Sequence, residues 1–205
     1  MRLLCCGDSA VLVEVDDLDE VLGLDAAWRA EPPPGLVETV PAARTVLVRF
    51  DPTSTDASTL ASALAATTPW PVSDAGTDEV VEIPTVYDGE DLDEVAELAG
   101  LEADRVVGLH AQAQYTVAFC GFAPGFGYLT GLDPRLHIRR RDTPRTAVPA
   151  GAVAVAGEFA AVYPHTSPGG WRIVGRTDIA MFSLDRDPPA LLRPGVRVRF
   201  ARVDG

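Results

Sequence analysis

Short apolar runs alternate with helix-like segments at the start of the chain. Residues 10–15 (AVLVEV) and 45–50 (TVLVRF) are β-branched apolar runs of strand length. Residues 18–29 and the alanine-rich residues 57–67 have patterns typical of helices, and Asp56 is suited to cap the second one. Two strands and two helices in this order predict a small α/β sandwich.

A stretch rich in proline, glycine, serine and aspartate follows at residues 68–78 (TPWPVSDAGTD). Such a composition is typical of a linker between domains. We therefore expect two domains, an N-terminal α/β domain over residues 1–78 and a second domain over residues 79–205.

The second domain begins with a strand-like and two helix-like segments, and then changes to short β-rich runs that glycine and proline interrupt. We expect a strand at residues 79–87, helices at 92–99 and 103–112, and strands at 115–122, 152–156, 160–163, 171–174, 179–183 and 196–203. Many short strands with little helix predict a β-barrel or β-sandwich. The fold class of the whole chain is therefore α+β.

The net charge of −13 is spread unevenly along the chain. Residues 1–104 hold 4 arginines against 23 acidic residues, whereas residues 105–205 hold 13 arginines against 7. The acidic first half argues against nucleic-acid binding. The basic second half is either an ordinary solvated arginine surface or a binding surface for a small anion such as a carboxylate or phosphate.

Residue types that are missing or rare exclude several kinds of site. All 17 basic residues are arginine, which excludes a Schiff-base lysine and a P-loop of the Walker type. Cys5 and Cys6 are expected to lie in a strand as reduced, partly buried thiols. Together with Cys120 and three scattered histidines, they predict no metal site. No apolar stretch approaches the roughly 20 residues of a membrane span, so we expect a cytoplasmic protein.

Glycine and aromatic residues dominate residues 121–129 (GFAPGFGYL), which suit neither a regular helix nor a strand. The aromatic side chains of Phe122, Phe126 and Tyr128 could form the wall of a pocket, while Pro124 and Gly125 shape the loop. The alternative is a tight connection whose aromatic side chains fill the core.

Arginine-rich residues 135–145 come next. Five of these eleven residues are arginines, and a planar guanidinium can hold a carboxylate or phosphate through two parallel hydrogen bonds. At most two should touch a ligand, with Arg139 and Arg145 as our candidates. The others are expected to be solvated or paired with Asp133 and Asp142.

Two further loops carry candidate residues. The turn at Pro149 is either a structural corner or a place where backbone amides face a ligand. Residues 167–171 (SPGGW) predict an exposed loop, in which Ser167, Gly169, Gly170 and Trp171 are candidate binding residues. The G-x-S-x-G motif of serine hydrolases is absent, so Ser167 is expected to be a hydrogen-bond donor or a turn residue.

His110 lies near the end of an expected helix, where a cation would suit the helix dipole. Such a histidine is either structural or a general base, and the sequence leaves both roles open.

Taken together and in this order, these motifs resemble the carboxyltransferase C–D domain family, variously called allophanate hydrolase subunit 1, KipI-like protein or the B-type subunit of 5-oxoprolinase. The resemblance covers nearly the whole chain and rests on residues 7–10, 50–52, 121–129, 131–136, 144–145, 148–151, 163–164, 167–171 and 175–177.

The resemblance implies a cyclophilin-like β-barrel for the second domain. It implies as partners an A-type subunit and a C-type subunit (allophanate hydrolase subunit 2, KipA-like), in a complex that opens 5-oxoproline to L-glutamate with ATP as co-substrate. On this basis His110, Arg145, Ser167 and Arg176 are candidate catalytic residues, with Arg145 and Arg176 as anion clamps. Two other functions stay open: a KipI-like inhibitor of a histidine kinase, and a split carboxyltransferase module of the urea carboxylase or allophanate hydrolase type.

Overall fold

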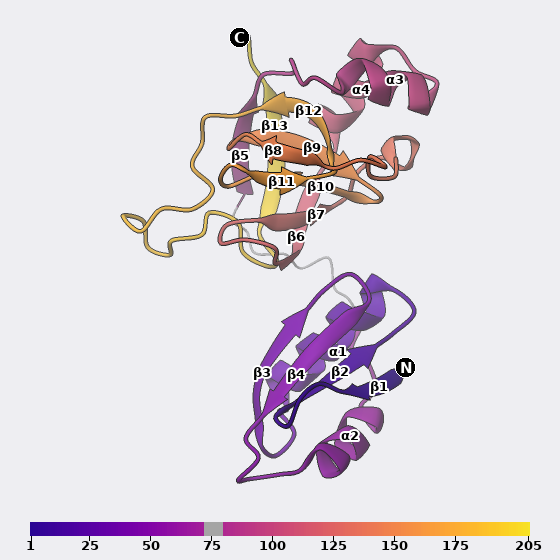
Figure 1. Ribbon diagram of the computed structural model, residues 1–205, viewed down its shortest axis with the longest axis vertical. Helices are drawn as coiled ribbons and strands as arrows, with labels where there is room; N and C mark the ends of the chain where they lie inside the picture. Colours follow the sequence, from indigo (N-terminus) through magenta and orange to yellow (C-terminus); the bar gives the residue numbers. More distant parts are fainter. Residues whose placement is uncertain (72–79) are drawn as a thin grey trace. The chain divides into compact units, whose positions relative to one another are not determined.

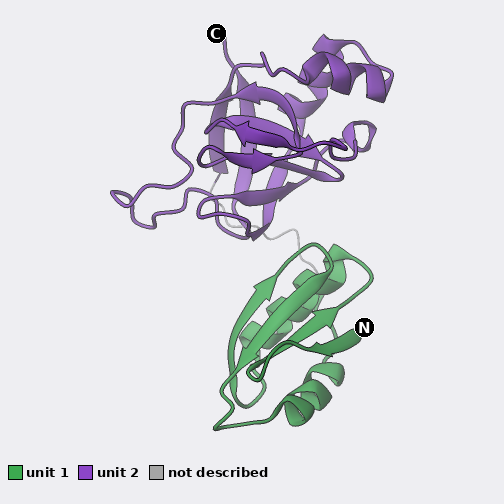
Figure 2. Ribbon diagram, in the orientation of Figure 1, with its two compact units in different colours: residues 1–74 green, residues 75–205 purple. Residues whose placement is uncertain are grey.

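The computed structural model describes residues 1–71 and 80–205, and the chain forms two compact units, residues 1–74 and 75–205 (Figure 2). The predicted domain boundary at residue 78 lies outside the described residues. So do most of the predicted linker, residues 72–78, and the first residue of the strand predicted at 79–87.

The first unit is a four-stranded antiparallel sheet with two helices packed on one face (Figure 1). Its elements are β1 (Arg2–Cys5), β2 (Ala10–Glu14), α1 (Leu18–Ala30), β3 (Leu36–Pro41), β4 (Thr45–Phe50) and α2 (Ala57–Ala65). The strand order is β1-β2-β4-β3. Alternate residues of β2 and β4 face the helices and form a buried core, which comprises Val11, Val13, Val46, Val48, Leu24, Trp28, Leu60 and Leu64.

Both helices begin at an aspartate. The Asp17 carboxylate accepts the backbone N–H of Glu20 at 2.9 Å, and Asp56 accepts those of Ser58 and Thr59, each at 2.9 Å. Such bonds satisfy donors that the first helical turn leaves free. The predicted α/β sandwich and the predicted cap at Asp56 are confirmed.

Strand β3 was absent from the prediction. Both β1 and β3 are edge strands with few buried side chains. Leu3 and Leu36 pack against the core. Val37 faces outward, with 58% of its surface exposed. The strand expected for Cys5 exists, but Cys5 and Cys6 are both exposed and Cys120 is half-buried. The prediction of partly buried thiols is therefore wrong for Cys5 and Cys6, because an edge position leaves them uncovered.

The second unit is a nearly closed barrel with two helices beside it (Figure 1). Its elements are β5 (Val80–Thr85), α3 (Leu92–Ala99), α4 (Ala103–Gln112), β6 (Tyr115–Cys120), β7 (Gly127–Thr130), the 3-10 turn η1 (Pro134–Leu136), β8 (Arg145–Val148), β9 (Ala152–Ala156), β10 (Phe159–Val162), β11 (Ser167–Gly169), β12 (Arg172–Arg176) and β13 (Arg197–Arg202). Seven strands form the sheet in the order β12-β9-β10-β7-β6-β13-β5, and β11 pairs with β8 separately.

The two ends of the seven-stranded sheet meet directly after β5. Val86 and Arg176 exchange two backbone hydrogen bonds, of 2.9 and 2.8 Å, which join the end of β5 to β12. Closure satisfies the backbone groups that an open sheet edge would leave unpaired. The predicted α+β class, with an α/β sandwich followed by a β-barrel, is confirmed.

One predicted strand, residues 179–183, is wrong. In the structure this segment belongs to a long irregular connection, and its only ladder contact is an isolated bridge between Phe182 and Ala190. Met181 is buried, with 1% of its surface exposed, so this connection contributes to the core by packing rather than by strand pairing. An apolar run therefore marked burial here, but not a strand.

No helix in residues 1–71 and 80–205 is long and apolar enough to cross a membrane.

Candidate functional site

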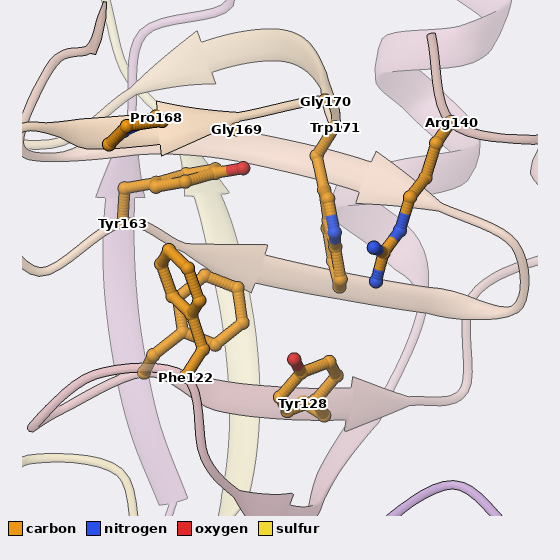
Figure 3. Close-up of a pocket in the computed structure, with 9 residues that line it drawn as sticks. Phe122, Tyr128, Arg140, Tyr163, Pro168, Gly169, Gly170 and Trp171 are labelled. Carbon is orange, nitrogen blue, oxygen red and sulfur yellow. The ribbon is translucent and has the colours of Figure 1, made fainter. Parts of the chain in front are cut away.

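Aromatic side chains from four segments of the barrel surround a small pocket (Figure 3). Its volume is about 100 Å³, well below the roughly 300–1,000 Å³ of typical ligand pockets. The pocket therefore suits a small ring and is too small for a nucleotide. Its lining residues are Phe122, Phe126, Tyr128, Arg140, Tyr163, Pro168, Gly169, Gly170 and Trp171.

Phe126 lies at the centre of this aromatic group. It is 2% exposed, and its ring meets Tyr128, Tyr163 and Trp171 edge to face with centroid distances of 5.1, 5.4 and 5.5 Å. Edge-to-face contacts of this kind stabilise a fixed ring arrangement beyond simple burial. The predicted aromatic wall thus exists, and its rings are held in place before any ligand arrives.

Phe122 is unlike the other rings because it is exposed and its backbone is strained. It is 61% exposed, and its φ of 67° makes it the only residue other than glycine with positive φ in the described parts of the chain. Its ring lies 5.2 Å from that of Phe126 and 6.3 Å from that of Tyr163. A large exposed ring on a strained backbone at the rim of a pocket is typical of a ligand-contacting residue.

We expect the Phe122→Gly variant to be about 1 kcal/mol more stable than Phe122→Ala, because glycine adopts positive φ without the steric cost. Both variants lack the ring, so the difference between their free energies of unfolding reports the backbone strain alone. Urea denaturation of the two proteins measures it. Equal stabilities would show that the strain at this position is negligible.

The hydroxyl groups of the two tyrosines stay protonated at neutral pH. Burial raises the pKa of Tyr163 and that of Tyr128 above their usual value. The neighbouring backbone N–H of Trp171 opposes this rise in the pKa of the Tyr163 hydroxyl without cancelling it. A Cβ on Gly169 would collide with this hydroxyl, which explains the need for glycine at that position.

The structure separates the clustered arginines into paired and unpaired ones. Five arginines near the pocket or along the predicted basic run are paired with carboxylates: Arg135 with Asp133, Arg139 with Asp142, Arg141 with Asp91 and Glu94, Arg145 with Glu90 and Asp91, and Arg172 with Glu94. Arg140 has no carboxylate within ion-pair distance among the described residues; its guanidinium carbon lies 5.9 Å from the Trp171 ring centroid.

Asp91 is the centre of the ion pairs behind the pocket. Its carboxylate is 3% exposed and accepts hydrogen bonds from Arg141 Nη1 at 2.7 Å, Arg145 Nη2 at 2.6 Å and the backbone N–H of Ile173 at 2.7 Å. Asp91 stands at the N-cap position of α3, but its side chain does not cap the helix. It joins α3, β8 and β12 instead.

Of the four candidate catalytic residues, none lines the aromatic pocket. Arg145 is behind it, on the strand paired with Gly169, and its guanidinium is held by Asp91 and Glu90. Arg176 pairs with Asp88 at 2.9 Å and lines a different pocket beside Val86 and Val203. The structure therefore does not bring Arg145 and Arg176 together as one anion clamp, since each is occupied by a different carboxylate.

His110 lies in the barrel core. It is fully buried, its Nδ1 is 2.8 Å from the Tyr87 hydroxyl, and its ring packs 4.5 Å from that of Phe200. Burial lowers the pKa of His110 to about 3. The core keeps the ring neutral, so His110 does not supply the cation that would suit the helix dipole at this position.

Ser167 is buried, and its hydroxyl has no hydrogen-bond partner within residues 1–71 and 80–205. It pairs with Val148 across β11 and β8, and it does not line the pocket, although Pro168, Gly169 and Gly170 do. His165 is exposed on the preceding loop. No base in the described part of the chain forms a hydrogen bond with this serine.

Five predicted binding residues line the pocket: Phe122, Tyr128, Gly169, Gly170 and Trp171. Four others do not: Pro124, Gly125, Arg139 and Pro149. Gly125 serves packing instead, since a Cβ there would lie 2.8 Å from that of Phe182, and the side chain of Arg139 is 82% exposed. Sequence reasoning missed Arg140, Tyr163 and Pro168 as lining residues; the only available signal was that Tyr163 and Pro168 belong to the recognised motifs.

Comparison with known proteins places the chain in a family. The family model of the carboxyltransferase domain, subdomain C and D, matches residues 1–192. Among curated relatives, the 5-oxoprolinase B subunit of Escherichia coli O157:H7 is 38% identical over an alignment of 208 positions with gaps, which covers 97% of this chain and 94% of that protein. The protein of the same name from Bacillus subtilis (strain 168) is 43% identical over 127 residues, which cover 60% of this chain and only 53% of that protein.

Solved structures have the same fold. TTHA0988 superimposes with a TM-score of 0.77 at 38% identity, covering 97% of this chain and 40% of that longer chain. The Kluyveromyces lactis urea carboxylase gives a TM-score of 0.77 at 22% identity, covering 98% of this chain and 21% of the enzyme, which supports the fold alone. The chain thus belongs to the carboxyltransferase C and D domain family, with relatives named as the B subunit of 5-oxoprolinase.

Proposed function

We propose that this chain is the B subunit of an ATP-dependent 5-oxoprolinase, which opens 5-oxoproline to L-glutamate together with A-type and C-type subunits. The observation that carries the proposal is the match to the Escherichia coli O157:H7 relative of that name across nearly the full length of both chains. A relative matched over its whole length supports a shared role better than one matched over half of it.

The aromatic pocket supports this proposal as the place where the substrate ring binds. 5-Oxoproline is a compact five-membered lactam with one carboxylate, which suits a volume of about 100 Å³ with aromatic walls. The protonated hydroxyls of Tyr128 and Tyr163 and the guanidinium of Arg140 offer hydrogen bonds to its oxygen atoms. The site is built for a small polar ring rather than for a nucleotide.

The proposed reaction begins with transfer of the γ-phosphoryl group of ATP to the lactam oxygen, which releases ADP. A first water then attacks the activated carbon, and the ring C–N bond breaks with the nitrogen taking up a proton, which gives γ-glutamyl phosphate. A second water hydrolyses this acyl phosphate to glutamate and inorganic phosphate. Negative charge develops on oxygen in each of these steps, and positioned donors stabilise such charge. The small pocket and the lack of lysine in this chain favour an ATP site on a partner protein of the complex.

Reconstitution tests the proposal. We expect the purified A, B and C subunits to release inorganic phosphate from ATP only when 5-oxoproline is present, with glutamate formed in equal amount. Omission of this chain should reduce turnover to the background rate. Undiminished turnover without it would refute the assignment.

A further inference from the structure

We propose that Arg140 is the residue that binds the substrate carboxylate, and that the buried carboxylate of Asp91 positions it. The proposal deepens the proposed function and rests on it for the identity of the substrate. Arg140 is the one arginine of residues 135–145 that both lines the pocket and lacks a carboxylate partner among the described residues. A cation without an internal partner beside a pocket is available for an anionic ligand.

The Arg140 side chain runs alongside the Trp171 indole, on the side of the pocket above Tyr128 (Figure 3). Stacking on an aromatic ring leaves the edge of a guanidinium free, and that edge carries the paired N–H groups that match a carboxylate. The substrate ring can then lie against the aromatic walls while its carboxylate points to Arg140.

The backbone on both sides of Arg140 is fixed to the pocket wall. The carbonyl oxygen of Arg139 accepts from Arg172 Nε at 3.2 Å, and the backbone N–H of Arg141 donates to the Gly170 carbonyl at 2.8 Å. Gly170 and its neighbour Trp171 both line the pocket. The segment that carries Arg140 is thus attached directly to the turn that forms the site.

Asp91 connects the segment that carries Arg140 to β8 and β12. It binds the side chains of Arg141 and Arg145, which follow Arg140 in the chain, and the backbone N–H of Ile173 in β12. Because Arg141 is held by Asp91 through its side chain and by Gly170 through its backbone, the position of Arg140 depends on Asp91. Asp91 is therefore a positioning residue, 3% exposed and out of contact with the substrate.

Steady-state kinetics of the reconstituted complex test the role of Arg140. We expect Arg140→Gln to lower kcat/KM for 5-oxoproline between about 10- and 100-fold, as for loss of a hydrogen bond to a charged group. The complex should also lose its preference for 5-oxoproline over the neutral carboxamide analogue. Arg139→Gln is the matched control, an adjacent and exposed arginine whose loss should change neither quantity. An unchanged preference in Arg140→Gln would overturn the proposal.

A double-mutant comparison tests the role of Asp91. Asp91→Asn should raise KM for 5-oxoproline with little change in kcat in the wild-type background, and should raise it no further in the Arg140→Gln background. Equal increases in KM in both backgrounds would show that Asp91 acts independently of Arg140, which would refute its positioning role.

Calorimetry separates failure of this inference from failure of the proposed function. If the wild-type complex does not turn over 5-oxoproline, the proposed function fails. Binding measurements can still test the role of Arg140. We expect the complex to bind 5-oxoproline more tightly than its carboxamide, and we expect Arg140→Gln to remove this difference. No difference between the two compounds in the wild type would overturn the carboxylate role.

Discussion

Replacement of Asp91 by alanine is expected to lower the free energy of unfolding of the barrel unit by about 3–5 kcal/mol. The variant leaves Arg141 and Arg145 without their shared buried carboxylate and leaves the backbone N–H of Ile173 without an acceptor. Removal of one partner from a buried ion pair is costly because the remaining charge stays out of water. Urea denaturation followed by circular dichroism measures the change.

Asp93→Ala is the matched control, because Asp93 is an exposed aspartate in the first turn of the same helix. It should cost less than about 1 kcal/mol, the size of an exposed charge–dipole interaction. If Asp91→Ala costs no more than this control, then Glu90 and Glu94 compensate for the missing carboxylate, and Asp91 is not the centre of the cluster.

Acid should destabilise the protein through His110 by about 3 kcal/mol between pH 7 and pH 4. The pKa of His110 is about 3 in the folded protein, whereas an exposed histidine titrates near 6.5. At pH values between these two pKa values, His110 is protonated in the unfolded chain and neutral in the folded protein. The contribution is therefore complete above about pH 6.5 and is lost progressively as the pH falls toward 3.

The measurement is the free energy of unfolding at several pH values for wild type and His110→Gln. Carboxylates also titrate in this range, so the difference between the two proteins isolates His110. His165→Gln, at an exposed loop position, should follow the wild-type profile. The same pH dependence in His110→Gln and wild type would contradict the assignment of His110 as a buried neutral group.

The central strands and helices of both units could be predicted from sequence because their apolar residues repeat with the period of the element. The strand over residues 10–15 and the helix over 103–112 are examples, observed as β2 and α4. Edge strands such as β3 could not be predicted in this way, since most side chains of β3 are exposed or only partly buried. An irregular connection can also be buried, as at Met181, and its apolar residues then form a run that looks like a strand in the sequence.

The candidate site was predicted in part, for a similar reason. The aromatic residues Phe122, Phe126 and Tyr128 share one short loop and strand, so their proximity follows from local sequence. Which arginine is left free to bind a ligand depends on acidic residues about 50 positions earlier in the chain. Asp91, which pairs with Arg141, is an example. No local pattern reveals which guanidinium meets such a carboxylate, and so the sequence favoured Arg139 and Arg145 over Arg140.

The position of β13 in the barrel also has a consequence for synthesis of the protein. This last strand lies between β6 and β5, and it pairs with β5 in parallel from Arg197–Val80 to Arg202–Thr85. Nearly 120 residues of chain therefore emerge from the ribosome before the first strand of the barrel gains its neighbour. The first unit has all its strand partners within residues 2–50 and can fold while the barrel is still being made. The order of synthesis thus allows the first unit to fold before the barrel is complete.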